Sequence, residues 1–270
     1  MISFPGCKIN LGLQIINKRS DGYHNITSVM YPIPIQDILE IVPLEKADKT
    51  IFTSSGLHIP GSEDENLCLK AYYLLKNKYN IPNVHIHLHK CIPMGGGLGG
   101  GSSDGAETIK LLDKLFELNI SIEDQKIIAS KLGSDCPFFI ENIPQFATGT
   151  GTTLRPIELD LKGYHLVLLN VGIHVSTKEA YTDVVLNQNN EDLKEYVKKD
   201  ITEWKNQLSN DFEMNVFKQY PNLEEIKSSL YEQGALYASM TGSGSTMFGI
   251  FNEIPKLISP ENGFLKVIKL

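Results

Sequence analysis

A run of glycines in the first half of the chain constrains its fold and function more than any other feature. Residues 93–105 have the sequence Pro-Met-Gly-Gly-Gly-Leu-Gly-Gly-Gly-Ser-Ser-Asp-Gly. Apolar residues alternate before this run, at 83–90, as in a strand, and recur after it with the spacing of a helix. Glycine permits close approach to a ligand, and successive backbone N–H groups at a helix N-terminus can surround an anion. We therefore predict a phosphate-binding loop, since a flexible linker is rarely placed between a strand and a helix.

Two common phosphate-binding motifs do not explain this loop. A Walker A loop ends in Gly-Lys-Ser/Thr, whereas no lysine follows Lys90 until Lys110. The dinucleotide motif Gly-x-Gly-x-x-Gly matches at residues 95–100, but its helix should lead into a second parallel strand. Here a second helix is predicted instead, which begins with a capping box at Ser121 and ends at Gly133.

The remaining sequence alternates between strand and helix patterns. Strands are predicted at residues 8–15, 165–171, 235–240, 246–251 and 264–270, and residues 26–42 are predicted to form further strands that are broken by prolines. Helices are predicted at 66–79 and, after a capping box at Ser176, through several polar segments up to Gly234. These elements predict an α+β protein of two lobes, formed by residues 1–155 and 156–270.

Composition limits the class of partner. The net charge of −7 disfavours nucleic acid and anionic membranes, which require a basic surface. The sequence has neither an apolar stretch of about 18 residues nor the pattern of a secretory signal. The four cysteines, Cys7, Cys68, Cys91 and Cys136, form no CxxC pair and are expected to be reduced. We expect a cytoplasmic protein, a monomer or weak homodimer, that binds neither nucleic acid nor membranes.

Five motifs in order along the chain resemble one family. The glycine loop is similar to the central ATP-binding motif of the GHMP kinases, and more narrowly of their diphosphocytidyl-methylerythritol kinase branch. The other four motifs are G-C-K-I-N-L-G-L with R-S-D-G-Y-H (6–24), G-S-D-C-P-F-F (133–139), V-S-T-K-E-A-Y (175–181) and M-T-G-S-G-S-T (240–246). The resemblance implies a two-lobed GHMP kinase fold, with a ribosomal-protein-like N-terminal domain and a ferredoxin-like C-terminal domain. It also implies ATP-dependent phosphorylation of the 2-hydroxyl of 4-diphosphocytidyl-2-C-methyl-D-erythritol, in the non-mevalonate route to isoprenoids.

The resemblance assigns the catalytic roles to two residues. Asp135 is the implied general base, and Lys8 is implied to contact both Asp135 and the substrate hydroxyl. From the residues alone, an aspartate in a turn is more often structural, and a lysine on a strand is more often solvated. General base catalysis typically accelerates a reaction by about 10²–10⁴-fold.

The remaining implied site residues bind the two substrates. The ATP-binding residues are Pro93, Met94, Gly95, Gly96, Gly97, Leu98, Gly99, Gly100, Gly101, Ser102 and Ser103, with Asn66 near the adenine. Mg²⁺ is expected on the phosphates, and the choice between Ser102 and Ser103 as its neighbour stays open. The small-molecule cytidine diphosphate substrate is expected to contact Asn10, Tyr23, His24, Asp135, Thr177, Tyr181, Gly242 and Ser243. Among these, His24 is implied to hydrogen-bond the cytosine and Tyr181 to stack on it.

Two positions depart from the family pattern, and one cluster lies outside it. Gly105 stands where alanine is more frequent and is expected to weaken the helix by about 0.5–1 kcal/mol. Thr152 stands where many relatives carry glutamate, so a metal role for that carboxylate is in doubt. His85, His87 and His89 share one strand face, which we interpret as an exposed surface; we predict no zinc site there.

Three alternative functions remain at this point. The chain could be a GHMP kinase for another small alcohol, such as homoserine or mevalonate, although the Tyr23–His24 pair and Tyr181 favour a cytidine ligand. It could be a catalytically inactive nucleotide-binding module, although it retains both Lys8 and Asp135. Nucleic-acid binding, suggested by a ribosomal-protein-like lobe, is disfavoured by the net charge.

Overall fold

The computed structural model describes residues 1–182, 184, 192–256 and 263–270 as two compact units. Unit 1 comprises Met1–Lys8, Pro34–Met94 and Gly99–Ile143, and unit 2 comprises Ile9–Ile33, Gly95–Leu98 and Pro144–Leu270. The mixture of helices and sheets confirms the predicted α+β class. The units are interleaved along the chain, and the boundary near residue 155 between two family domains stays a prediction.

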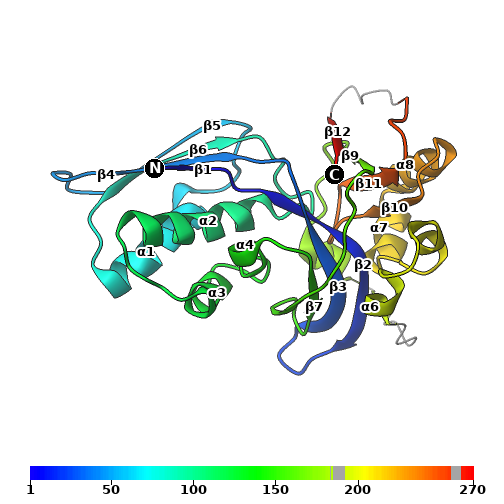
Figure 1. Cartoon of the computed structure of the whole chain (residues 1–270), viewed down its shortest axis with the longest axis horizontal. Coiled ribbons are helices and arrows are strands. Elements are labelled where there is room, and N and C mark those ends of the chain that lie inside the picture. Colours follow the sequence, from blue (N-terminus) through cyan, green and yellow to red (C-terminus); the bar gives the residue numbers. More distant parts are fainter. Residues whose placement is uncertain (183, 185–191, 257–262) are drawn as a thin grey trace. The chain divides into compact units, whose positions relative to one another are not determined.

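Unit 1 contains one sheet and the helices that cover it. The strands lie in the order β1-β4-β6-β5, namely β1 (Ile2–Ser3), β4 (Ile38–Pro43), β6 (Val84–Lys90) and β5 (Ile51–Gly56). β4 runs antiparallel to β6, and β5 runs parallel to it. The helices are η1 (Glu63–Glu65), α1 (Leu67–Tyr79), α2 (Gly100–Leu115), α3 (Ile122–Ser130) and α4 (Phe138–Glu141). Figure 1 shows α1 and α2 running along one side of this sheet.

Capping residues set the ends of the helices as the sequence predicts. Asn66 is the N-cap of α1, where its side chain accepts a hydrogen bond from the N–H of Cys68. Ser121 caps α3 in the same way, but α3 ends at Ser130, three residues before Gly133. The α-helix ends there because the chain tightens into a turn, in which the N–H groups of Lys131 and Leu132 donate to the carbonyl oxygens of Ile128 and Ala129, three residues earlier.

Gly105 has a packing role that its helix propensity alone does not predict. A Cβ atom added to Gly105 would lie 2.9 Å from Cβ of Leu67 and 3.2 Å from Cδ1 of Leu132. The glycine therefore lets α2 approach α1 closely, in addition to any effect on the stability of its own helix.

The histidines of β6 are half-buried, so the predicted exposed surface is only partly correct. Val84, Ile86 and Leu88 are buried on one face of β6, and the three histidines alternate with them on the other. Thr53 of β5 hydrogen-bonds the rings of His85 and His87 at 2.9 and 2.8 Å. Ser55 likewise joins His87 to His89. Among the described residues, no group of three or more histidine, cysteine or carboxylate side chains is arranged to hold a metal ion.

Unit 2 contains two four-stranded sheets. One has the order β2-β3-β7-β8, formed by β2 (Cys7–Lys18, which enters from unit 1), β3 (His24–Ile33), β7 (Gln145–Thr148) and β8 (Thr153–Pro156). The other has the order β10-β11-β9-β12, formed by β10 (Tyr237–Met240), β11 (Met247–Phe251), β9 (His165–Asn170) and β12 (Phe264–Lys269). The described helical segments are α5 (Thr177–Ala180), α6 (Leu193–Tyr196), η2 (Ile201–Asn206), α7 (Phe212–Gln219) and α8 (Pro221–Glu232).

The second sheet agrees with the predicted ferredoxin-like C-terminal domain. All its strand pairs are antiparallel, and in chain order its strands lie 2-3-1-4 across the sheet. β9 is an inner strand that is buried from Leu166 to Asn170, as its continuous apolar sequence predicts. Residues of α7 and α8, among them Phe212, Val216, Leu223 and Leu230, share a core with this sheet. Every helix in the described part of the chain is too short or too polar to cross a bilayer.

Candidate active site

The predicted catalytic pair lies within unit 1. Lys8 is the second residue of β2, and Asp135 lies in the turn that precedes α4. The Lys8 Nζ atom is 3.5 Å from Oδ2 of Asp135, and the two side chains are 3% and 31% exposed. The pair therefore places a buried ammonium group beside a carboxylate that a ligand can reach.

The start of α2 lies next to this pair. Gly99 is the N-cap of α2 in a left-handed conformation, with φ of 71°. A Cβ atom on Gly99 would lie 3.0 Å from Cζ of Phe139 and 3.3 Å from Cε of Lys8, so a larger residue would be displaced. No described side chain caps α2. Its first N–H groups, at the positive end of the helix dipole, are thus suited to bind an anion.

A buried cysteine connects the first turn of α2 to the Asp135 turn. The side chain of Ser102 hydrogen-bonds the thiol of Cys136, which directly follows Asp135. Burial raises the pKa of Cys136 to about 12, so the thiol stays neutral. Ser103 is itself buried.

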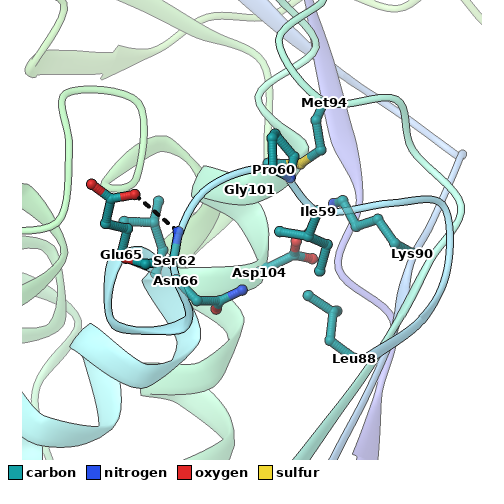
Figure 2. Close-up of a pocket in the computed structure, with 11 residues that line it drawn as sticks. Ile59, Pro60, Ser62, Glu65, Asn66, Leu88, Lys90, Met94, Gly101 and Asp104 are labelled. Carbon is teal, nitrogen blue, oxygen red and sulfur yellow. Dashed lines mark hydrogen bonds and ion pairs between the residues drawn. The ribbon is translucent and has the colours of Figure 1, made fainter. Parts of the chain in front are cut away.

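A pocket of about 100 Å³ lies beside the glycine run, within unit 1 (Figure 2). Ile59, Leu67 and Leu88 contribute apolar surface to it, and Met94 and Gly101 of the predicted ATP-binding segment also line it. Asn66 lines the pocket as well; its Oδ1 is used as the cap of α1, which leaves its amide nitrogen as a donor. An apolar pocket with a polar donor suits a nucleobase.

Sequence reasoning missed a buried charged cluster at this pocket, formed by Asp37, Lys90 and Asp104. Lys90 Nζ forms ion pairs with Asp37 and with Asp104, the latter at 2.7 Å. Burial raises the pKa of Asp104 to about 7, although the Lys90 charge opposes this rise. Burial disfavours the charged form of Lys90, but Asp104 and Asp37 outweigh it and raise the pKa of Lys90. One signal was present in the sequence: Lys90 continues the inward-facing alternation of Val84, Ile86 and Leu88.

Within unit 2, Thr241 joins Asn10 to the glycine run. The N–H of Asn10 donates to Oγ1 of Thr241 at 3.1 Å, and that hydroxyl lies 3.2 Å from the carbonyl oxygen of Gly97. The amide group of Asn10 also donates to Ser28 at 2.8 Å. A Cβ atom on Gly97, whose φ is 78°, would lie 2.0 Å from the carbonyl oxygen of Thr241. Only glycine can occupy this position, and Thr241 is a site residue that we did not predict.

The C-terminal glycine turn packs against the same part of the run. Gly242 and Ser243 lie in the turn of the β10–β11 hairpin. The N–H of Thr246 donates to the carbonyl oxygen of Gly96 at 3.2 Å, and Asn170 donates to the Thr246 hydroxyl at 2.9 Å. The turn therefore does more than connect two strands, because it also supports residues 96–97.

The residues predicted for the cytidine end also lie in unit 2. The rings of His24 and Tyr181 are stacked, with centroids 4.7 Å apart and planes 14° apart. Phe212 meets Tyr181 edge-on at 4.8 Å. Tyr23 is 67% exposed, and Thr177 is the exposed first residue of α5. Burial, and to a lesser extent the charge of Lys18, lowers the pKa of His24, which keeps the ring neutral near pH 7.

The predicted site residues are thus divided between the two units. Unit 1 holds Lys8, Asn66, Pro93, Met94, Asp135 and residues 99–103. Unit 2 holds Asn10, Tyr23, His24, Thr177, Tyr181, Gly242, Ser243 and residues 95–98. Thr152, the departure from the family glutamate, is exposed in the β7–β8 turn, where its hydroxyl contacts that of Thr150.

Family models match the two parts of the sequence that contain the main motifs. The model described as "GHMP kinases N terminal domain" matches residues 66–142. The model described as "GHMP kinases C terminal" matches residues 190–258.

Individual relatives and solved structures agree with these matches. The 4-diphosphocytidyl-2-C-methyl-D-erythritol kinase of Cytophaga hutchinsonii is 52% identical over 95% of this chain and 94% of its own length. The protein of the same name from Caldanaerobacter subterraneus is 40% identical over 93% of this chain and 88% of its own. A crystal structure of 4-(cytidine 5'-diphospho)-2C-methyl-D-erythritol kinase superposes with a TM-score of 0.77 at 29% identity, covering 93% of this chain and 90% of that one. Methanococcus jannaschii mevalonate kinase shares the fold, with a TM-score of 0.69 at 17% identity over 93% of this chain and 90% of that one.

Proposed function

We propose a function from the premise that this chain belongs to the GHMP kinase family, within its group of 4-diphosphocytidyl-2-C-methyl-D-erythritol kinases. The chain transfers the terminal phosphoryl group of ATP to the 2-hydroxyl of 4-diphosphocytidyl-2-C-methyl-D-erythritol, a step in isoprenoid biosynthesis. The observation that carries this proposal is the Lys8–Asp135 pair beside the glycine-capped start of α2. The family membership makes the chain an ATP-dependent kinase; a cytoplasmic location and a monomeric or weakly dimeric state stay predictions.

The residues of unit 1 are suited to hold ATP. The first N–H groups of α2 would bind the phosphates, and the pocket beside Asn66 would hold the adenine. Mg²⁺, when bound, neutralises charge on the phosphates and usually keeps several of its waters, so it needs few protein ligands. Ser102 and Ser103, at the start of α2, are the side chains that we propose nearest to it.

Phosphoryl transfer requires mainly positioning and charge stabilisation from the protein. In the proposed mechanism, Asp135 accepts the proton of the attacking hydroxyl, which its partial exposure allows. The ammonium group of Lys8 stabilises the negative charge that develops on the reacting oxygens. Gly99 maintains the distance between Lys8 and the start of α2, because any side chain there would meet Lys8 and Phe139.

The residues of unit 2 are proposed to recognise the cytidine substrate. His24, with Tyr181 stacked on it, offers a neutral ring nitrogen for the edge of cytosine. The exposed ring of Tyr23 offers a surface on which a base can stack. Asn10 is proposed to orient the sugar-alcohol part, and the hydrogen bond from Asn10 to Ser28 fixes its side chain.

A comparison of substrates tests the proposed specificity. We expect rapid phosphorylation of 4-diphosphocytidyl-2-C-methyl-D-erythritol, and rates at least about 10³-fold lower with mevalonate or homoserine. The measurement is ADP release in a coupled assay, with phosphorus NMR of the product. Equal rates on all three alcohols would support the alternative of a less specific GHMP kinase.

Substitution of the catalytic pair tests the proposed chemistry. Asp135→Asn is expected to lower kcat by about 10²–10⁴-fold, because the amide cannot accept the proton. The affinity of the variant for nucleotide should stay within about threefold of the wild type, since Asp135 is not among the residues that we propose to bind ATP. Glu141→Gln, which alters an acidic residue of the adjacent helix α4, is the matched control and should retain activity. A fully active Asp135→Asn enzyme would remove Asp135 from the mechanism.

A further inference from the structure

The Asp37–Lys90–Asp104 cluster lies directly beneath the start of α2, within unit 1. A Cβ atom added to Gly100 would lie 3.1 Å from Nζ of Lys90. The side chains of Lys90 and Asp37 are completely buried, and that of Asp104 is 3% exposed. Asp104 follows Gly100 by four residues and therefore lies on the same face of α2.

The cluster holds the chain on both sides of the glycine run. Before the run, Asp37 accepts hydrogen bonds from the N–H groups of Cys91 and Ile92. After the run, Asp104 accepts a hydrogen bond from Lys90 at 2.7 Å. Lys90, the last residue of β6, connects these two carboxylates. The cluster thereby fixes where the run begins and where α2 begins after it.

The energetics argue that this cluster does not serve stability alone. A buried ion pair recovers its desolvation cost only when its remaining polar atoms are also satisfied. Asp104 also lies against a second buried carboxyl group, that of Asp37, which further raises the pKa of Asp104, and its Oδ1 atom accepts no N–H or O–H group of the described residues. A lysine near a helix N-terminus also opposes the helix dipole. Since apolar residues of similar size often replace a buried ion pair without loss of stability, a role in positioning explains the charges better.

We propose that Lys90, through its two carboxylate partners, is a positioning residue that holds the glycine run in the conformation that binds the nucleotide phosphates. This proposal rests on the proposed function as an ATP-dependent kinase. Neither the resemblance to the family nor the proposed mechanism gave a role to Asp37, Lys90 or Asp104, and this proposal assigns them one. Loss of the Lys90–Asp104 contact should weaken nucleotide binding and leave the chemistry at Asp135 largely intact.

The experiment compares two substitutions of Asp104 with a control on the same helix. Asp104→Leu removes the contact while Lys90 keeps Asp37, and Asp104→Asn keeps an oxygen that can accept from Lys90. Glu107→Leu breaks the 2.7 Å ion pair with Lys110 one turn further along α2. Binding of a non-hydrolysable ATP analogue with Mg²⁺ is measured by calorimetry, which does not depend on turnover. KM for ATP and kcat are measured in parallel, with circular dichroism to verify folding.

We expect Asp104→Leu to weaken analogue binding and raise KM for ATP by about tenfold or more, with kcat at saturating ATP within about threefold. Asp104→Asn should recover most of the affinity, and Glu107→Leu should change it less than twofold. A folded Asp104→Leu protein with wild-type affinity would overturn the proposal, as would an equal loss in Glu107→Leu. If Asp104→Leu does not fold, Asp37→Asn/Lys90→Met/Asp104→Leu, which removes all three charges and keeps an acceptor for the N–H groups of Cys91 and Ile92, takes its place under the same criteria. A wild-type protein that binds the analogue but phosphorylates no alcohol would contradict the proposed function, and the comparison of analogue binding among the variants would still decide the role of Lys90.

Discussion

At the scale of single residues, much of the candidate site depends on hydrogen bonds between positions far apart in the sequence. Thr241 is the clearest case, because its one hydroxyl contacts both Asn10 and Gly97. The same residue's carbonyl oxygen occupies the space that a side chain on Gly97 would need. Thr241 therefore contacts both strand β2, at Asn10, and the glycine run, at Gly97.

Two substitutions of Thr241 should distinguish the effect of its hydroxyl group from the effect of its side-chain size. Thr241→Val keeps the shape but removes the acceptor for the Asn10 N–H, which costs about 1–3 kcal/mol in a buried site. We expect kcat/KM to fall about tenfold, with a lower thermal midpoint. Thr241→Ser keeps the hydroxyl and should retain at least a third of the activity. Equal losses in both variants would assign the effect to packing rather than to the hydrogen bonds.

At the scale of elements, α1 packs closely against the first turns of α2, the helix that the glycine run enters. The two helices approach closely at Gly105, and α1 begins directly after its N-cap Asn66, which lines the pocket. A change in the separation of these helices would therefore reach the pocket. The low helix propensity of Gly105 is the cost of this close approach.

Gly105→Ala tests this packing, because two effects of opposite sign compete. Alanine improves helix propensity by about 0.5–1 kcal/mol, but its Cβ would lie 2.9 Å from Cβ of Leu67, which cannot move without its backbone. Overpacking typically costs about 1–3 kcal/mol. We expect a net loss, with a thermal midpoint about 2–4 °C lower.

Gly101→Ala is the control for this measurement of stability. It lies in the same helix, and its added Cβ would meet only the flexible end of Met94, at 3.4 Å. Its thermal midpoint should be unchanged or higher. A stabilised Gly105→Ala protein would show that helix propensity outweighs the contact with Leu67.

At the scale of the whole molecule, the chain crosses repeatedly between two units, and two of the crossings, before Gly95 and after Leu98, fall inside the glycine run. Neither unit is a continuous stretch of sequence, so each completes its core only when distant segments have been synthesised. The buried cluster of unit 1 joins the segment before β4, the end of β6 and α2. The protonation of this cluster should therefore affect the stability of the folded chain.

The pH dependence of stability follows from the raised pKa of Asp104. Its pKa is about 7 in the folded chain and 3.8 in its unperturbed state, so the folded state binds more protons between these values. The stability that this group contributes is fully present below pH 3.8 and is lost as the pH rises through 7.

Thermal unfolding of wild type and Asp104→Asn across pH 4.5–8 tests this linkage. Because asparagine does not titrate, the midpoint of the wild type should fall relative to the variant by roughly 3–6 °C over this range. The difference between the two curves isolates Asp104 from the other titrating groups. Parallel curves would show that Asp104 is ionised throughout the range.

Local patterns in the sequence were sufficient for most elements and for the type of site. The alternation of β6, the caps at Asn66 and Ser121, and the glycine run between strand and helix each depend on neighbouring residues. The five motifs identified the family, and Lys8 and Asp135 were predicted to meet and do so. The elements, caps and glycine run follow from the sequence because their physical causes act over a few residues or along one element, whereas the contact between Lys8 and Asp135 was implied by the resemblance to the family.

Only the tertiary structure revealed the contacts that hold the site together. Lys90 lies 53 positions from Asp37, and Thr241 lies 144 positions from Gly97, and no local pattern marks either pairing. The role of Gly105 in helix packing and the histidine ladder on β6 also appear only when separate elements are placed side by side. The effect of a buried charge, or of the absent Cβ of a glycine, depends on the atoms that lie next to it. Those atoms belong to distant parts of the sequence and are brought there only by the fold of the whole chain.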